Sequence, residues 1–278
     1  MNLNSLAISV IMPAYNAEKY IKEAIESILN QTFKDFEFII VDDASTDNTR
    51  KIIGTYAKKD GRIKVLYNEK NLGIVHSYNK AIKIAKGKYI AILENDDIAA
   101  PTRLEKQFVF MEANPKVGVC GTNIVLINEK GKEIGRRIRP ELDKECRRAF
   151  FLYCPIFHTT AMIRKECFEK LGYYDDKFIY AQDIEIFMRF SIGYKLHNLQ
   201  EFLGYYRLHA ANASFKRWAR AIKSAQMARL TAVREYHYSF PLLGYPAILF
   251  TCFFHIMPSK LAYKVTGLLR KIFLKKER

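Results

Sequence analysis

The sequence predicts an α/β domain with a mostly parallel β-sheet flanked by helices on both faces. In the first hundred residues, short segments that are apolar at most positions alternate with segments whose apolar residues recur at helical spacing. Strands that are apolar on both sides are typical of parallel sheets covered by helices. Hydrophobic residues make up 49% of the 278 residues and charged residues 27%, and these globular values exclude a disordered, collagen-like or polytopic membrane chain.

The predicted elements follow one another in a regular order. We predict strands at 8–12, 36–41, 63–67 and 89–93. Between them, two sets of apolar residues predict helices: Ile21, Ala24, Ile25 and Ile28, then Val75, Tyr78, Ala81, Ile82 and Ala85. Beyond Pro101 we expect a helix at 102–113, a strand at 117–127, a turn at 128–131 and a helix at 216–237. The pattern between the turn and residue 215 mixes helix and short strand.

The C-terminal part differs from the rest of the chain. Residues 241–257 form an apolar run that Gly244 and Pro246 interrupt, which is short for a bilayer span and favours an interfacial or re-entrant segment. In 259–278, apolar and basic residues occupy different faces of a predicted amphipathic helix: Leu261, Val265, Leu268, Leu269 and Ile272 on one, Lys260, Lys264, Lys271 and Lys275 on another. The alternative is a terminal helix docked on the domain with solvated lysines.

The positive charge lies mostly in this C-terminal part. The chain has a net charge of +16, and residues 216–278 hold 13 Lys and Arg against two Asp and Glu. Such a segment attracts nucleic acid or an anionic membrane. The basic residues are interleaved with an apolar face and no nucleic-acid-binding motif is present, so the membrane surface is favoured and a nucleic-acid-binding protein is the alternative.

Other features bear on the cellular compartment. None of the five cysteines forms a CxxC pair, which favours a reducing compartment and disfavours a disulfide framework or a cysteine zinc site. Met1 is followed by Asn-Leu-Asn-Ser without a basic or apolar leader, so we expect no signal peptide and a cytosolic body.

Polar residues follow three of the predicted strands. These are Pro13-Ala-Tyr-Asn16, Asp42-Asp43-Ala-Ser-Thr-Asp47 and Glu94-Asn-Asp-Asp97. Ligands bind beyond the carboxyl ends of strands in open α/β sheets, and several acids meeting there repel one another unless a cation or a ligand lies among them. Glu94 and Asp96 point to the same side, which suits Mg²⁺ or Mn²⁺ that also binds phosphate. The alternatives are capping loops, above all for Ser45 and Asp47, and a solvated acidic turn.

The chain resembles the family 2 glycosyltransferases, which are inverting, nucleotide-sugar-dependent enzymes of the GT-A fold. The resemblance runs from about Ile8 to Ser214. Five segments carry it in the right order: VIMPAYNAEKYIKEAIESILNQTFKDFEFIIVDDASTDNT (10–49), NLGIVHSYNKAIKIAKGKYIAILENDDIAAPTRLEKQ (71–107), HTTAMIRKECFEKLGYYDD (158–176), AQDIEIFMR (181–189) and YRLHAANAS (206–214). It implies a GT-A catalytic domain at 1–215, with a nucleotide-binding half at about 1–100 and an acceptor half at about 101–215. Residues 216–278 would be a helical, membrane-associating extension.

The resemblance also assigns roles on the donor side. It implies that Pro13, Ala14, Tyr15 and Asp43 line the nucleoside pocket, with Asp42 as a weaker candidate. Asp43 would accept a hydrogen bond from the base, usually uracil. Glu94-Asn95-Asp96 occupies the family's Asp-x-Asp metal motif, with Asp96 as the expected ligand to Mn²⁺ or Mg²⁺. Glu94 departs from the commonest residue, Asp, but still offers a carboxylate to the sugar or to water.

On the acceptor side, Asp183 falls where the family has its catalytic base. Gln182 stands where a Glu is usual there, and losing that neighbouring charge would lower the pKa of the base. Arg207 and His209 match a Tyr-Arg-x-His element near the diphosphate. The alternatives are that Asp183 caps a helix at 184–190 and that His209 is a loop residue.

These features together predict an inverting hexosyl- or N-acetylhexosaminyltransferase. It would move a sugar from a nucleotide sugar, usually UDP-linked, to a glycan or lipid-linked acceptor in surface polysaccharide synthesis. We expect a peripheral or monotopic protein at the cytoplasmic face of the inner membrane, bound to anionic lipid and not to nucleic acid. The second alternative is a related domain that binds sugar nucleotide without catalysis.

Overall fold

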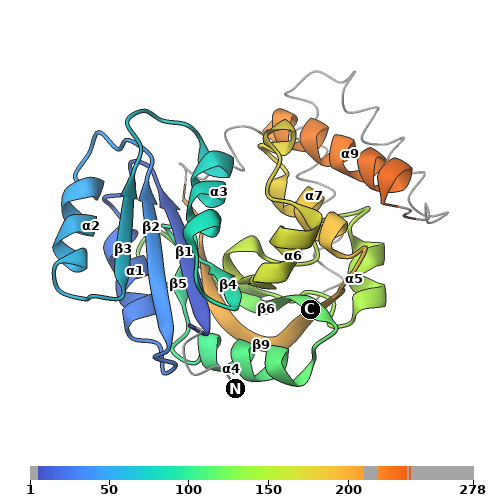
Figure 1. The fold of residues 1–278 in the computed structure, drawn as a ribbon, viewed down its shortest axis with the longest axis horizontal. Coiled ribbons are helices and arrows are strands. Elements are labelled where there is room, and N and C mark those ends of the chain that lie inside the picture. The colour runs from blue at the N-terminus through green and yellow to red at the C-terminus, as the bar shows by residue number, and fades with distance from the viewer. Residues whose placement is uncertain (1–5, 210–217, 237, 239–278) are drawn as a thin grey trace.

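A computed structural model describes residues 6–209, 218–236 and 238 (Figure 1). The strands are β1 (Ile8–Ala14), β2 (Phe36–Asp42), β3 (Ile63–Tyr67), β4 (Tyr89–Ile92), β5 (Ile98–Ala99), β6 (Val117–Ile127), β7 (Glu133–Arg137), β8 (Met162–Arg164) and β9 (Lys195–Arg207). The helices are α1 (Ile21–Leu29), α2 (Thr49–Ala57), α3 (Ile74–Ile84), α4 (Arg103–Ala113), α5 (Asp143–Ala149), α6 (Lys165–Leu171), α7 (Gln182–Phe190) and α9 (Trp218–Glu235), with short 3-10 turns at His158–Thr160 and Asp176–Phe178.

The strands form one sheet in the order β3-β2-β1-β4-β8-β6-β9-β5, with β7 beside β6. β3, β2, β1 and β4 are parallel to one another, as predicted. Beyond β4 the sheet is mixed, because β8 runs antiparallel to both β4 and β6 while β9 runs parallel to β6. The expectation of a mostly parallel sheet is therefore correct only for the first half of the chain. Figure 1 shows the sheet curling at β6 and β9.

Apolar side chains fill both faces of the sheet, as the strand pattern predicts. Successive side chains of a strand point to opposite faces. In β1, Ile11 therefore packs under α3 and α7, whereas Val10 and Met12 pack against α1 and α4. The predicted helix sets occupy these two cores, α1 on one face and α3 on the other.

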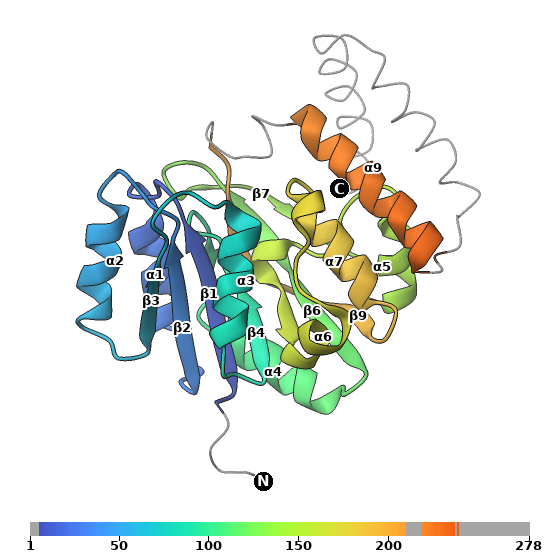
Figure 2. The ribbon, with the colours of Figure 1, turned by 45° about the horizontal axis from the view of Figure 1, so that its top comes forward.

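The helix α9 packs on the body of the domain although it belongs to the segment predicted as an extension. Ala225, Ala228 and Ala232 join the core under α7. Arg229 Nε donates to the Phe150 carbonyl over 2.7 Å. Figures 1 and 2 both show α9 lying along α7.

The rest of the predicted extension lies outside the described residues. This applies to the apolar run 241–257 and to the amphipathic segment 259–278. Within the residues that the structure describes, no helix combines the length and the apolar character that crossing a membrane requires.

A close approach of backbone at Gly87 leads to a stability prediction. A Cβ at Gly87 would lie 2.3 Å from Ser9 N and 2.5 Å from Ile8 C, both atoms of β1. Because backbone in a central strand cannot move aside cheaply, we expect Gly87→Ala to lower the free energy of unfolding by about 1–3 kcal/mol or more. Gly61→Ala is the matched control, since nothing lies within 4 Å of its added Cβ. Equal urea midpoints for the two variants would contradict this expectation.

Candidate functional site

The predicted site residues lie at the carboxyl ends of neighbouring strands. Ala14, at the end of β1, pairs with Asp42, at the end of β2. Asn95 follows β4, and its Nδ2 donates to the carbonyl oxygen of Pro13 over 2.9 Å. The loops after β1, β2 and β4 therefore meet at one edge of the sheet, where α/β folds bind their ligands.

The loops after β1 and β2 are bonded to each other. Asn16 Oδ1 accepts from the Thr46 N–H over 2.8 Å, and the Asn16 N–H donates to Ser45 Oγ over 3.1 Å. Asn16 and Ala44 have positive φ angles of 49° and 60°. Strained backbone of this kind concentrates at ligand sites. Asp47 accepts from the first backbone N–H of α2 over 2.9 Å, in agreement with the capping role considered for it.

The carboxylate of Asp43 is occupied by the chain itself. Its Oδ1 accepts from Asn68 Nδ2 over 2.7 Å and from the Leu72 N–H over 2.9 Å. Its Oδ2 accepts from the Gly73 N–H over 2.8 Å. Only 4% of Asp43 is exposed. Asp43 therefore holds the loop between β3 and α3 at this edge of the sheet.

Asp42 is fully buried beside Arg50. Its Oδ1 accepts from the Ser45 N–H over 3.3 Å, while its Oδ2 lies 3.7 Å from Arg50 Nε without forming a hydrogen bond. The Arg50 guanidinium also lies 4.2 Å from the centre of the Tyr67 ring.

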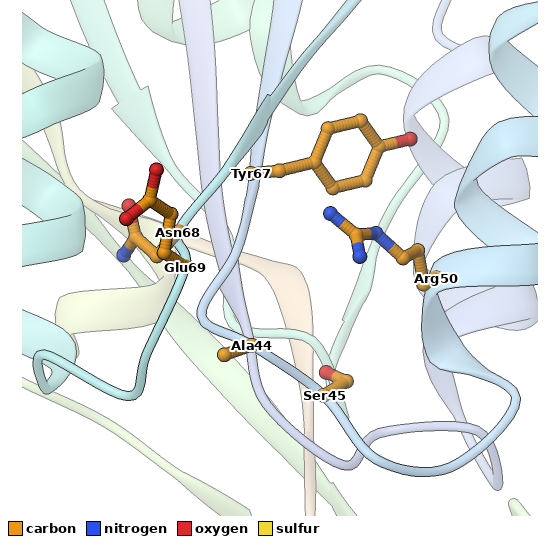
Figure 3. A pocket seen from close by; sticks show the side chains of 6 residues that line it. All are labelled: Ala44, Ser45, Arg50, Tyr67, Asn68 and Glu69. Atoms are coloured by element: carbon orange, nitrogen blue, oxygen red, sulfur yellow. The ribbon is translucent and has the colours of Figure 1, made fainter.

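A pocket of about 500 Å³ opens beside these loops (Figure 3). It is lined by Ala44, Ser45, Arg50, Tyr67, Asn68 and Glu69. On the neighbouring loop, 47% of Tyr15 is exposed, so its ring presents a flat apolar surface next to this edge of the sheet. The pocket and the Tyr15 ring suit an aromatic ligand such as a nucleobase.

Removing the charge of Asp43 tests its place in this loop. In Asp43→Asn one of the two carboxylate oxygens becomes an NH₂ group that faces a backbone or side-chain donor. Leaving such a buried donor unsatisfied costs about 1–3 kcal/mol, so we expect a lower melting temperature together with weaker binding of UDP. Asp35→Asn, at an exposed position, is the control. A melting temperature equal to the wild-type value would contradict the assignment.

The acids that follow β4 have different surroundings. Asp96 Oδ2 lies 2.8 Å from His209 Nε2, and Asp97 Oδ1 accepts from the Arg207 N–H over 2.9 Å. Burial raises the pKa of the Asp96 carboxyl in spite of the hydrogen bond to His209. Burial, and then the charge of Asp96, raises the pKa of Asp97 well above its usual range. Negative charge is thus costly here, which favours a cation.

Asp96 and His209 are the candidate ligands for a divalent cation. The Asp96 carboxylate and the His209 imidazole lie side by side and offer the oxygen and nitrogen ligands that Mn²⁺ accepts. In the described ranges 6–209 and 218–236, no group of three or more His, Cys, Asp or Glu side chains could hold a metal ion. Cations of this kind complete their shell with water and substrate phosphate, so two protein ligands are compatible with such a site. The Glu94 carboxylate turns toward Tyr78 and His158 instead.

Arg207 is used within the protein. It is 1% exposed, its Nε donates to the carbonyl oxygen of Asp96 over 2.9 Å, and its Nη2 pairs with Glu23 over 2.7 Å. The guanidinium lies 4.6 Å from the centre of the Tyr20 ring, which also packs against His209. Arg207 therefore holds the segment that carries Asp96.

Asp183 lies in the first turn of α7 and does not cap it. The helix begins at Gln182, its N-cap is Ala181, and no side chain forms a capping hydrogen bond. The alternative of a cap on a helix at 184–190 is therefore wrong. Burial, and then the charge of Asp183, raises the pKa of the Cys154 thiol, which lies next to the carboxylate.

The helix α7 packs near the residues that follow β4. The ring of His158, which bonds to Glu94, lies 5.9 Å from the ring of Phe187, one helical turn after Asp183. Burial, and then the charges of Glu94 and Asp183, raises the pKa of Tyr174, which bonds to the other side of His158.

Some residues of the site escaped the sequence analysis. His158 and Tyr174 lie within the segment 158–176 that carried the resemblance, so a signal for them existed. Arg229, buried near Asp183, had none, because its position depends on the packing of α9 against a helix far away in the sequence.

Fold and site together define an α/β enzyme with an acidic ligand site at the carboxyl edge of its sheet. The model of glycosyl transferase family 2 matches residues 9–172, more than half of the chain. The chain therefore belongs to this family of glycosyltransferases, and the family resemblance in the sequence is confirmed.

Characterised and uncharacterised relatives agree with this assignment. The uncharacterized glycosyltransferase MJ1057 of Methanocaldococcus jannaschii is 45% identical over 206 residues, which cover 72% of this chain and 70% of the relative. WfaP of Escherichia coli, a UDP-Glc:alpha-D-GlcNAc-diphosphoundecaprenol beta-1,3-glucosyltransferase, is 34% identical over 233 residues, 83% of this chain and 88% of WfaP.

Solved structures show the same fold at lower identity. Residues 1–349 of Staphylococcus aureus TarS, solved with UDP, superpose with a TM-score of 0.63 at 23% identity. The match covers 81% of this chain and 65% of the TarS chain, so this chain spans just under two thirds of that structure. The mannosyltransferase PcManGT of Pyrobaculum calidifontis, solved with GDP-Man and Mn²⁺, gives a TM-score of 0.65 at 18% identity. The match covers 98% of this chain and 81% of PcManGT. The fold is therefore of the GT-A type, with a curled mixed sheet between helices.

Proposed function

We propose that this chain is an inverting glycosyltransferase that moves a hexosyl or N-acetylhexosaminyl group from a UDP-sugar to a glycan or lipid-linked acceptor. The observation that carries the proposal is that His158 bonds to Glu94, on the donor side, and packs against Phe187, one helical turn after Asp183 on α7. A donor bound along the sheet edge would then present its sugar to an acceptor next to Asp183. The relative WfaP, which uses UDP-Glc, supports this donor class.

The donor nucleotide would lie over the loops after β1 and β2. The exposed Tyr15 ring would form the apolar side of the base site, with the buried Pro13 and Ala14 holding it at the end of β1, and Asp43 would keep the opposite loop in place. Asp42 would act on the donor indirectly, because its carboxylate lies beside the Arg50 side chain that lines the pocket. Stacking of the base on Tyr15 supplies affinity, while the loop geometry selects the base.

Asp96 and His209 would hold Mn²⁺ or Mg²⁺ next to the diphosphate. When bound, the cation offsets the negative charge that grows on the leaving group. Glu94 and Asn95 would accept and donate hydrogen bonds at the donor sugar. Arg207 contributes by holding the backbone of Asp96 in place.

Asp183 would be the catalytic base. It accepts the proton of the acceptor hydroxyl as that oxygen bonds to the anomeric carbon and the bond from this carbon to the diphosphate breaks. General base catalysis of this kind contributes about 10²–10⁴-fold. Because attack comes from the face opposite the leaving group, an α-linked donor gives a β-glycoside.

The basic C-terminal part would bring the enzyme to its acceptor. Lipid-linked acceptors lie in the membrane, and WfaP acts on a diphosphoundecaprenol-linked sugar. Each Lys or Arg near an anionic membrane contributes about 1 kcal/mol of binding. We place the protein peripherally or monotopically at the cytoplasmic face of the inner membrane, with a role in surface polysaccharide synthesis.

A thermal-shift screen tests the donor class. UDP-glucose, UDP-N-acetylglucosamine and GDP-mannose are each added with and without Mn²⁺, and release of UDP or GDP is followed in parallel. We expect a Mn²⁺-dependent rise in melting temperature with a UDP-sugar and slow release of UDP. No shift with any of the three would contradict the proposal, and a shift without any turnover would favour a non-catalytic binding domain.

Removing residues 239–278 tests the membrane role. We expect the shortened protein to leave the membrane fraction, because the chain then loses both its apolar run and the lysines of its amphipathic segment. A matched full-length variant with Lys260, Lys264, Lys271 and Lys275 changed to Glu separates charge from apolar contact. Retention of the shortened protein in the membrane fraction would overturn this part of the proposal.

A further inference from the structure

A chain of hydrogen bonds joins Glu94 to Tyr174 through His158. His158 Nδ1 lies 2.9 Å from Glu94 Oε1, and His158 Nε2 lies 2.8 Å from the Tyr174 hydroxyl. The Tyr78 hydroxyl donates to the same Glu94 oxygen over 2.7 Å. Two partners on one oxygen fix both the position and the rotation of the Glu94 carboxylate.

The helix α3 holds both ends of this chain. Tyr78 bonds to Glu94. The side chain of the next residue, Asn79, donates to the Tyr174 carbonyl oxygen over 2.8 Å and accepts from the Tyr174 N–H over 3.0 Å. Tyr78 and Tyr174 are buried, and only 10% of the His158 side chain is exposed. A buried polar network whose members are all bonded is rigid.

The network depends on the length of Glu94. The family most often has Asp at this position, and an Asp carboxylate would end about 1.5 Å earlier. At that reach neither Tyr78 nor His158 would remain within hydrogen-bonding distance of the carboxylate. The network therefore requires Glu at position 94 in place of the commoner Asp.

We propose that His158, supported by Tyr174, is a positioning residue that fixes the Glu94 carboxylate for the donor sugar. This inference rests on the proposed function, in which Glu94 meets that sugar, and it adds a residue that touches no substrate itself.

Three variants test the role of His158. In His158→Asn the amide stands in for Nδ1 and keeps the bond to Glu94, whereas in His158→Gln it stands in for Nε2 and keeps only the bond to Tyr174. Glu94→Asp removes both contacts to the carboxylate while restoring the commoner motif residue. The first readout is UDP release in the presence of Mn²⁺, from UDP-glucose or UDP-N-acetylglucosamine according to which of the two the wild type hydrolyses faster. The second is the rise in melting temperature caused by UDP alone.

We expect His158→Gln to release UDP about 10- to 100-fold more slowly, the effect of one lost hydrogen bond to a charged group, Glu94→Asp to lose at least as much, and His158→Asn to stay within about threefold of the wild type. The shift caused by UDP alone stays unchanged in all three, which shows that the nucleotide site is intact. Wild-type rates in Glu94→Asp, or equal losses in the two His158 variants, would overturn the inference and leave the proposed function standing. A wild-type protein that neither binds nor hydrolyses either donor would overturn both.

Discussion

Asp183→Asn is expected to abolish sugar transfer while donor binding stays within a few-fold of the wild-type value. The amide keeps the shape of the side chain but cannot accept the proton of the attacking hydroxyl. A loss of about 10²–10⁴-fold in kcat is the usual contribution of a general base. Because Asp183 forms no capping bond in α7, the substitution removes no hydrogen bond from the helix start. The measurement is transfer to a lipid-linked acceptor, with UDP binding followed by thermal shift.

Asp176→Asn is the matched control for this variant. Asp176 lies in the neighbouring turn and is exposed. We expect wild-type transfer from it. Transfer by Asp183→Asn at a rate close to the control would show that another group takes the proton.

Asp96→Asn is expected to cost about 10²–10³-fold in turnover, the loss that follows removal of one group stabilising charge in the transition state. Its carboxylate, which bonds to His209, is one of the two proposed ligands of the cation. We also expect the donor-induced melting shift of this variant to become independent of Mn²⁺. EDTA should stop turnover of the wild type, and added Mn²⁺ or Mg²⁺ should restore it.

The adjacent acid supplies the control for this second experiment. Burial, and then the charge of Asp96, raises the pKa of Asp97, so the amide of Asp97→Asn imitates the neutral form that these surroundings favour. Its Oδ1 contact with the Arg207 N–H can persist in the amide. We expect this variant to keep its response to Mn²⁺. Full wild-type activity in EDTA would remove the metal from the mechanism.

The sequence predicted local features better than long-range ones. The strands of the first half were predicted because burial on both faces leaves a continuous apolar pattern, as in Phe36–Asp42. The antiparallel pairing of β8 was not, because a strand as short as Met162–Arg164 shows no direction in its pattern. Pairing direction follows from the path of the whole chain.

At the candidate site, too, the sequence indicated local features better than long-range contacts. Strand ends indicated Asp43 and Asp96, and the family resemblance indicated Asp183, but neither showed what each carboxylate contacts. Asp43 bonds to Leu72 and Gly73, 29 and 30 residues away along the chain, and Arg207 reaches Glu23 across 184 residues. Contacts of this range are set by the packed fold, so the sequence alone could not show what Asp43 and Arg207 bond to.

The packing of α9 has a practical consequence for recombinant production. A polypeptide stopped at residue 215, where sequence patterns alone put the end of the catalytic part, would leave the outer surface of α7 bare where Ala225, Ala228 and Ala232 now cover it. Bare apolar surface of this kind leads to aggregation. Tyr236 and Tyr238 add bonds to Glu185 and Ser191, so an expression clone that ends just past Tyr238 keeps this cover.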